Sequence, residues 1–441
     1  MVGRTTFRHP SGRLVRPVLH TGSARVFLAD LATAARLDQP SAASPPPPPD
    51  DVRDARLADA GLLVEVDRDE AAEILDQGRA AARDLRTRSF VVMPSAYCNM
   101  GCGYCGQRHT RGRVSGRHRD ALVERIDRIS RSGRYDTINV RWFGAEPLMG
   151  FAVLRDLATR FTASTDAAGI GYTSKIVTNG VLLDARKLRV LHRQCRIRQV
   201  EVTLDGTAEV HDASRPVKRG GGSFRHILTT IASALTDPEL TGLYFVVRTN
   251  VGTHNAALAD RFAAELAEAG LAHDRVTCYP APIHSWGNDV TALTVSPREM
   301  AEAELSWFAA YQRHGLRFGL LPTAVTRVVC TATSRHSEVI DAGGRVFSCT
   351  EQPLVAAEEG TALGEVTTLD PVGPRPAGAF DDWYEAVAAG ETPCRTCAIL
   401  PLCGGACPKL WRDGLAPCPP LRDNVRDRLD LYAIGSGCRP G

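Results

Sequence analysis

The stretch CNMGCGYC at residues 98–105 decides the fold, because it spaces three cysteines as CxxxCxxC. An apolar run at 90–93 predicts a strand just before it. Three thiolates on one short loop can hold three corners of a 4Fe–4S cluster and leave its fourth iron open. The same spacing suits a zinc knuckle, with His109 as a fourth ligand, or a redox dithiol. Alone, the motif predicts a metal or redox site and leaves its kind open.

The other cysteines favour metal binding over disulfides. The 441 residues contain thirteen cysteines, of which three lie at 98–105 and five at 394–418. No secretion signal and no apolar stretch of about 20 residues stands out, so we expect a cytoplasmic protein without a membrane partner. Clustered cysteines in a reducing compartment more often bind metal than form disulfides.

Charge and length set broad limits on the partners and the domain count. The net charge is +3, and the Lys and Arg residues are scattered rather than massed. This pattern predicts no nucleic-acid partner. The length allows two or three domains.

From residue 86 the sequence alternates between short apolar runs and helix-length segments. Such alternation predicts parallel βαβ units that close fully or partly into a barrel, with the chemistry at the C-terminal ends of the strands. Strands are expected at 90–93, 138–142, 174–178, 199–204, 244–250 and 276–279, and helices at 121–130, 151–168, 224–235 and 257–269.

The remaining segments complete the predicted organisation. Residues 1–85 form a small N-terminal unit, with a hairpin around Thr21-Gly22-Ser23, a proline-rich connector at 41–51 and helical sequence after it. Residues 86–290 form the barrel, and 291–329 a helical linker. Residues 330–441 are predicted to be a loop-rich domain organised by metal, because cysteine, glycine and proline dominate its sequence.

Polar motifs follow the predicted strands in order. WFGAEP at 142–147 follows the second strand, Thr178-Asn179-Gly180 ends the third, and Thr203-Leu204-Asp205-Gly206 ends the fourth. Arg215 comes shortly after, and Arg248 ends the fifth strand. With the CxxxCxxC loop, this series resembles the radical S-adenosylmethionine (radical SAM) superfamily, so the predicted fold is α/β with a partial (βα)6 radical SAM barrel.

The resemblance implies a 4Fe–4S cluster on Cys98, Cys102 and Cys105 and a site for S-adenosylmethionine (AdoMet). GAEP stands where the superfamily has GGEP, so Ala145 replaces the second glycine. A carboxylate suits the ammonium of AdoMet, and a glycine lets the backbone approach the ligand. The cofactor-binding residues implied are Tyr104, Gly144, Ala145, Glu146, Asn179, Thr203, Arg215 and Arg248.

The seven cysteines from 330 to 418 resemble a SPASM domain, which implies two auxiliary 4Fe–4S clusters and three clusters in all. By that resemblance Cys394, Cys397, Cys403 and Cys418 bind the outer auxiliary cluster, and Cys330, Cys349 and Cys407 bind the inner one. The fourth position of the inner cluster is either an open iron or a distant thiolate such as Cys278. Zinc binding is the alternative reading of the same cysteines.

SPASM relatives act mostly on peptides or proteins, so the resemblance implies a maturase of ribosomally made precursor peptides. The enzyme would cleave AdoMet to a 5′-deoxyadenosyl radical, abstract hydrogen from the peptide and crosslink or otherwise modify a side chain. Its electron donor would be a flavodoxin or a ferredoxin. Glu351 is the candidate catalytic base, and His284 and Trp286 are candidates for substrate contact. Residues 1–85 either dock the leader of the precursor or cap the barrel.

Two other functions compete with this one. An anaerobic sulfatase maturase would make formylglycine, but such relatives carry an aspartate where this chain has Thr350, followed by Glu351. A non-catalytic iron–sulfur scaffold or electron carrier would not need Glu146, Thr203 and Arg215 at strand ends.

Overall fold

The computed structural model describes residues 1–38, 51–84, 86–112 and 114–441. Residues 41–50 of the predicted proline-rich connector lie outside this range. The chain divides into two compact units, each assembled from separate segments. The first unit contains 1–81, 320–329 and 383–441, and the second contains 82–319 and 330–382.

The second unit is built on a mostly parallel sheet. Its nine strands follow the order β12-β11-β10-β4-β5-β6-β7-β8-β9, so β4 and β9 are not paired and the barrel is partial. The six predicted strands form β4–β9 and are all parallel, which confirms the α/β class. Their bounds are β4 Thr87–Val92, β5 Thr137–Trp142, β6 Gly171–Thr178, β7 Ile197–Thr203, β8 Tyr244–Val251 and β9 Val276–Pro282.

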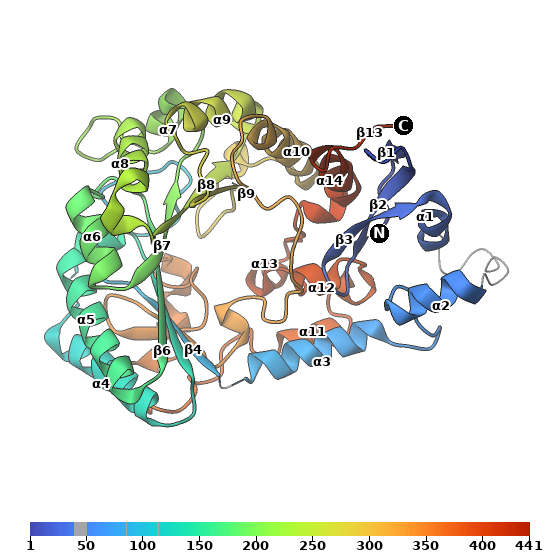
Figure 1. Cartoon of the computed structure of the whole chain (residues 1–441). Helices are drawn as coiled ribbons and strands as arrows, with labels where there is room; N and C mark the ends of the chain where they lie inside the picture. Colours follow the sequence, from blue (N-terminus) through green and yellow to red (C-terminus); the bar gives the residue numbers. More distant parts are fainter. Residues whose placement is uncertain (39–50, 85, 113) are drawn as a thin grey trace. The chain divides into compact units, whose positions relative to one another are not determined.

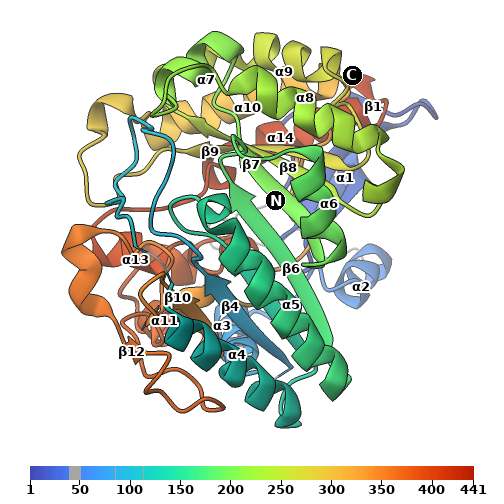
Figure 2. The same ribbon diagram turned by 90° about the vertical axis from the view of Figure 1, so that its left-hand side faces the viewer.

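Helices cover one face of these strands (Figures 1 and 2). Apolar side chains fill the interface: Trp142 of β5 stacks on Phe161 of α5 with ring centroids 6.0 Å apart, and Val200 and Val247 are fully buried. The helices are α4 Gly116–Arg131, α5 Phe151–Ala168, α6 Ala185–Arg193, α7 Ala208–Ser214, α8 Phe224–Thr236, α9 Ala259–Glu268 and α10 Pro297–Arg313. The four helices predicted between the strands correspond to α4, α5, α8 and α9, and α10 lies in the predicted helical linker, while α6 and α7 were not predicted.

Three short strands that the sequence did not reveal extend the sheet beyond β4. They are β10 Ser337–Ile340, β11 Arg345–Phe347 and β12 Gly364–Glu365. Strand β10 runs parallel to β4, and β11 and β12 are antiparallel to their neighbours. Buried Glu338 of β10 pairs with Arg88 of β4 and with Arg125 of α4, which fixes this edge of the sheet. Strands of two to four residues are too short for a clear alternation of side chains.

The first unit combines the N-terminal hairpin with the C-terminal helices. Its antiparallel sheet has the order β13-β1-β2-β3, and the predicted hairpin is β2–β3. Leu19 of β2 packs with Leu402, Val425 and Leu429 in one core. The elements are β1 Phe7–Arg8, β2 Leu14–His20, β3 Arg25–Asp30, α1 Leu31–Leu37, α2 Asp51–Asp59, α3 Glu70–Ala82, α11 Trp383–Ala388, α12 Leu400–Cys403, α13 Pro408–Arg412, α14 Leu421–Gly435 and β13 Arg439–Pro440.

This grouping differs from the predicted division of the chain. Residues 1–85 and 330–441 were assigned to separate domains, whereas β1 pairs with β13 and α14 packs on β2. Residues 330–382 belong with the large sheet because β10 pairs with β4. The physical reason is that pairing and burial between segments far apart in sequence leave no local signal. Among the described residues, no helix is long and apolar enough to cross a membrane.

Candidate active site

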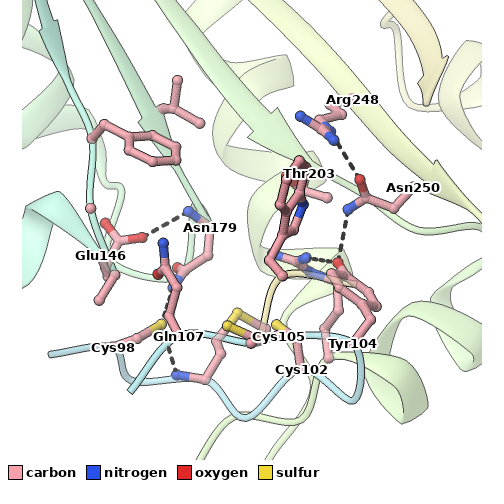
Figure 3. Close-up of a pocket in the computed structure, with 18 of the residues that line it drawn as sticks. Cys98, Cys102, Tyr104, Cys105, Gln107, Glu146, Asn179, Thr203, Arg248 and Asn250 are labelled. Atoms are coloured by element: carbon pink, nitrogen blue, oxygen red, sulfur yellow. Dashed lines mark hydrogen bonds between the residues drawn. The ribbon is translucent and has the colours of Figure 1, made fainter. Parts of the chain in front are cut away.

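The three cysteines of the CxxxCxxC loop line one pocket of the second unit (Figure 3). The segment before α8 anchors this loop: Gly101 N donates to Pro216 O at 2.9 Å, and Gly103 N donates to Ser214 O at 3.1 Å. Burial raises the pKa of the Cys98 thiol to about 11 and also raises that of Cys102. Thiols with raised pKa values become thiolate ligands when a bound cation offsets the cost of the charge.

Glu146 lies fully buried at the end of β5 and connects neighbouring strand ends. Its carboxylate accepts from Leu148 N at 2.9 Å, from the Thr178 hydroxyl at 2.7 Å and from Asn179 N at 2.8 Å. Burial raises its pKa, and these three donors oppose the shift. A carboxylate has about four acceptor positions, so one remains for a further donor. Asn179 in turn donates from Nδ2 to Cys98 Sγ at 3.5 Å.

The backbone conformation accounts for the residues of the GAEP motif. Gly144 has φ of +126°, and a Cβ placed there would lie 3.1 Å from Ser95 O. A glycine is therefore required at 144. Ala145 has no positive φ and packs against the buried cluster that contains Val91 and Phe347. Alanine thus fits at the position where the superfamily has its second glycine.

A buried polar network surrounds the other side of the loop. The Tyr104 hydroxyl donates to Asp205 at 2.5 Å, and it accepts from Arg215 and, at 2.9 Å, from Asn250 Nδ2. Asn250 N donates to Asp205 at 2.7 Å, and Arg248 Nε donates to the Asn250 side chain at 2.9 Å. Figure 3 shows Tyr104, Thr203, Arg248 and Asn250 gathered above Cys102 and Cys105.

Asp205 is a central residue of this network that its sequence motif did not single out. It is fully buried and lies 3.4 Å from Arg215, which makes it the counter-charge of that guanidinium. Its backbone N donates to His211 Nδ1 at 3.1 Å. Asp205 stands in the motif Thr203-Leu204-Asp205-Gly206, but an aspartate is common in turns. Only the contacts in the structure reveal that its carboxylate accepts from Tyr104, Asn250 and Arg215.

The opposite wall of the pocket comes from two later loops. His284 and Trp286 follow β9, with ring centroids 5.7 Å apart, and Glu351 follows β11. Gly106 lies against Trp286 so closely that a Cβ at 106 would be 1.7 Å from Trp286 O. Burial lowers the pKa of His284, and Arg248 lowers it further.

All predicted site residues of the barrel, and the candidate base Glu351 from the later segment, therefore line one pocket. They are Cys98, Cys102, Tyr104, Cys105, Gly144, Ala145, Glu146, Asn179, Thr203, Arg215, Arg248 and Glu351. In the described residues no three Cys, His, Asp or Glu side chains converge as ligands of a metal ion. The ligands of a 4Fe–4S cluster bind different irons, so a cluster does not require that convergence.

The residues present fit a cluster with AdoMet beside it. Three thiols line the pocket, Gly144 opens its backbone toward it, and Arg215 offers charge next to Cys102. Arg215 Nε is buried and has no hydrogen-bond partner in the described part of the chain. A buried unpartnered donor on a guanidinium suits an anionic group such as a carboxylate.

Four C-terminal cysteines gather in the first unit. The pKa of Cys403 is raised to about 11 by burial and further by Cys397, Cys394 and Cys418. Gly404 and Gly405 both have positive φ, and their carbonyls accept from the indoles of Trp383 at 3.0 Å and Trp411 at 2.8 Å. The local turns therefore hold Cys394, Cys397, Cys403 and Cys418 as one group.

The three other predicted ligands are divided between the units. Cys330 and Cys349 belong to the second unit, where Cys349 packs with Ala332 and Phe380. Cys407 belongs to the first unit. Cys278 is fully buried in β9, beside Tyr311 of α10. Its neighbour Tyr279 faces Glu201, so the Cys278 side chain points to the opposite, helix-covered face of the sheet.

Residues 92–236 match the sequence model of the Radical SAM superfamily. The chain therefore contains a radical SAM domain over this stretch. Such a domain implies a 4Fe–4S cluster and AdoMet binding, which the pocket residues fit.

The chain is also similar in sequence to known sulfatase-maturating enzymes. The chain is 22% identical over 338 residues to the serine-type anaerobic sulfatase-maturating enzyme of Klebsiella aerogenes, covering 70% of this chain and 77% of the relative. The corresponding enzyme of Klebsiella pneumoniae is also 22% identical over 338 residues, covering 70% of this chain and 79% of that relative. The solved structure of native anSMEcpe with bound AdoMet and Cp18Cys peptide shares the fold, with a TM-score of 0.61 and 15% identity, covering 79% of this chain and 97% of that one.

Proposed function

We propose that this enzyme modifies a side chain of a ribosomally made precursor peptide by radical chemistry. The observation that carries the proposal is the pocket itself, which joins the cofactor-binding residues of the strand ends to a wall of His284, Trp286 and Glu351. Relatives named for maturing sulfatases, and a related fold bound to a peptide, support a peptide or protein substrate. A scaffold or electron carrier would need no such pocket.

The chain's own residues would divide the work as follows. Cys98, Cys102 and Cys105 would hold the cluster, which when bound supplies the electron that cleaves AdoMet to methionine and a 5′-deoxyadenosyl radical. Arg215 would bind the carboxylate of AdoMet, and the end of β5 at Glu146 its ammonium. Tyr104 and Asp205 would orient Arg215. Trp286 and Gly106 would close the pocket against water.

The oxidation balances if the peptide loses two electrons and two protons. One hydrogen atom goes to the deoxyadenosyl radical, one proton to a base and one electron to an acceptor. Glu351 lines the pocket and is the proposed base. Two auxiliary 4Fe–4S clusters would supply the electron acceptor: the four-cysteine group of the first unit would hold one, and the resemblance implies Cys330, Cys349 and Cys407 for the other. A flavodoxin or ferredoxin would reduce the AdoMet-binding cluster.

For the inner auxiliary cluster we propose an open iron rather than a fourth thiolate from Cys278. That side chain faces the helix-covered side of the sheet, and burial raises its pKa to about 12. Rotating it toward a cluster would require rebuilding β9.

The test is anaerobic reconstitution with assays for iron, 5′-deoxyadenosine and peptide product. Three 4Fe–4S clusters predict about twelve irons per chain. Deoxyadenosine must form under dithionite, and a short peptide encoded beside the gene must change mass when added. Cleavage without any modified peptide would contradict the proposed substrate class, and bound zinc without cleavage would contradict the radical chemistry.

Formylglycine formation is the second candidate, favoured by the 22% identity to sulfatase-maturating enzymes. Thr350 stands where the resemblance calls for an aspartate, and Glu351 next to it faces the pocket. A sulfatase-derived peptide that carries Ser or Cys distinguishes the two functions. An aldehyde trapped by a hydrazine reagent would favour formylglycine, while a mass loss without an aldehyde would favour a crosslink.

A further inference from the structure

The two faces of the parallel sheet differ in a way that the cofactor site does not explain. On the face covered by helices, Val140, Ile176 and Val200 are fully buried. On the other face the alternate residues Arg141 and Lys175 are only half-buried. A packed barrel fills this interior with branched apolar side chains. Here the interior face carries charge instead.

Arg141 and Lys175 form a cationic pair on adjacent strands. They are direct partners in the register of β5 and β6, which places their Cα atoms about 4.8 Å apart. Like charges at facing positions repel. Neither side chain makes a hydrogen bond or an ion pair within the described residues. The chain therefore keeps two cations together at a cost in stability.

The neighbouring charges do not neutralise this pair. Glu201 of β7 accepts from the Tyr279 hydroxyl at 2.9 Å, and it is the acid that acts on Lys175. Burial lowers the pKa of Lys175, and Arg141 lowers it further, whereas Glu201 opposes the shift. Arg141, Lys175 and Glu201 together carry a net charge of one positive unit.

The pair lies one layer below the candidate active site. Arg141 and Lys175 come two residues before Phe143 and Val177, which line the pocket. Side chains two positions apart on a strand share a face and are separated by about 7 Å. Arg141 and Lys175 do not themselves line the pocket. A spacing of about 7 Å corresponds to about two residues of an extended peptide, so a peptide that occupies the pocket would bring a group two residues away near the pair.

We propose that Arg141 and Lys175 bind a carboxylate of the substrate peptide, either an Asp or Glu side chain or the C-terminal carboxylate. This inference rests on the proposed function, because it names the substrate class of the same site. A guanidinium and an ammonium side by side match the two oxygens of a carboxylate. The pair would fix which residue of the peptide lies beside the cofactor.

The test measures binding without turnover. Three pentapeptides carry a neutral fluorophore at the N-terminus: Gly-Gly-Asp-Gly-Gly with an amidated end, its Asn counterpart, and pentaglycine with a free carboxyl end. Fluorescence anisotropy is followed on the anaerobically reconstituted enzyme with AdoMet and no reductant. We expect at least one carboxylate peptide to bind about tenfold or more tighter than the Asn peptide, as a hydrogen-bonded charge pair provides. The tighter of the two identifies the source of the carboxylate.

The variants assign the effect to the pair. Arg141→Gln with Lys175→Gln should reduce the affinity for the carboxylate peptide to that of the Asn peptide, and Lys175→Arg should retain it. Arg225→Gln removes an exposed charge from α8 and should change nothing. Iron content and AdoMet binding verify that each variant is folded.

Equal affinity for the Asp and Asn peptides, with pentaglycine no tighter, would overturn the inference. So would tight carboxylate binding that survives in the double variant. Because no turnover is involved, either failure leaves AdoMet cleavage and peptide modification by the wild-type enzyme intact, and so is distinct from a failure of the proposed function.

Discussion

The two groups of cysteines are held in different ways. The loop with Cys98, Cys102 and Cys105 lines a pocket and is surrounded by residues from the ends of five strands, β5 to β9. The group from Cys394 to Cys418 is held by its own turns, with tryptophan indoles on the carbonyls of Gly404 and Gly405. The first arrangement leaves a pocket beside the thiols, and in the second the turns hold the thiols. Under the proposed function, the same ligand chemistry would serve the reaction in one place and electron transfer in the other.

The largest expected difference between the groups follows from removing one ligand from each. Cys98→Ala should abolish 5′-deoxyadenosine formation, because the open-iron cluster would lose one of three protein ligands. Cys403→Ala should lower the iron content but leave AdoMet cleavage, since Cys403 belongs to the other unit. Iron, sulfide and deoxyadenosine are measured on both variants. Loss of cleavage in Cys403→Ala with the 98–105 cluster intact would contradict the division of roles.

The second effect tests the buried ion pair beside the first group. Asp205→Asn leaves Arg215 without its counter-charge, and breaking a buried pair in this way costs about 3–5 kcal/mol. Anaerobic urea unfolding measures the change. Asp166→Asn is the matched control, because its pair with Arg196 is exposed and should contribute little. An equal loss in the two variants would mean that Asp205 is only a turn residue.

The surroundings of the first group could be predicted in part because their signals are local. Six strands, four helices between them and eleven pocket residues follow from apolar runs and the short motifs at their ends, whereas Glu351 was a candidate only through its place after Cys349. Asp205 was not singled out, since its importance lies in contacts with Tyr104 and Asn250 that are distant in sequence. The pairing of β10 with β4 and of β1 with β13 was missed for the same reason.

Two glycines, Gly144 and Gly106, show the same limit of prediction from sequence. Gly144 was identified by its motif, and the backbone requires it there. Gly106 belongs to no motif, and its need arises solely from the approach of Trp286, which is 180 residues away in the chain. A glycine that is required because of a long-range contact cannot be identified from the sequence around it.

Gly106→Ala provides the third test. The added Cβ would lie 1.7 Å from Trp286 O, which is backbone and cannot rotate away, so the pocket wall must move. A displacement of about 1 Å near a reacting centre can cost about 100-fold in rate. The rate of deoxyadenosine formation measures the effect. Gly112→Ala, in open space on the same loop, should keep the wild-type rate, and equal rates for both variants would show that Trp286 does not bound the site.

The smallest expected effect is a pH dependence of the free energy of unfolding, and it arises beside the first cysteine group. His211 supports Asp205 through its Nδ1 and lies 3.0 Å from the Ser223 hydroxyl through its Nε2. Burial lowers the pKa of His211 to about 4, Arg215 lowers it further, and Asp205 and Asp212 oppose the shift. The unfolded chain binds a proton near pH 6.5 and the folded chain does not, so the stabilising contribution is complete above 6.5 and is lost as the pH falls toward 4.

The size of that loss can be isolated with His211→Gln, which keeps polar atoms in place of both ring nitrogens but does not titrate. At pH 5.5 the wild type should have lost about 1.4 kcal/mol more of its free energy of unfolding than the variant, relative to pH 7.5. Taking the difference between the two proteins removes the other titrating groups they share. At the four-cysteine group, Arg422 donates to Cys418 Sγ at 3.1 Å and stays charged throughout this pH range. Iron bound by this group should therefore be retained at both pH values. Parallel stability curves for wild type and variant would show that His211 is not buried as a neutral imidazole beside Asp205.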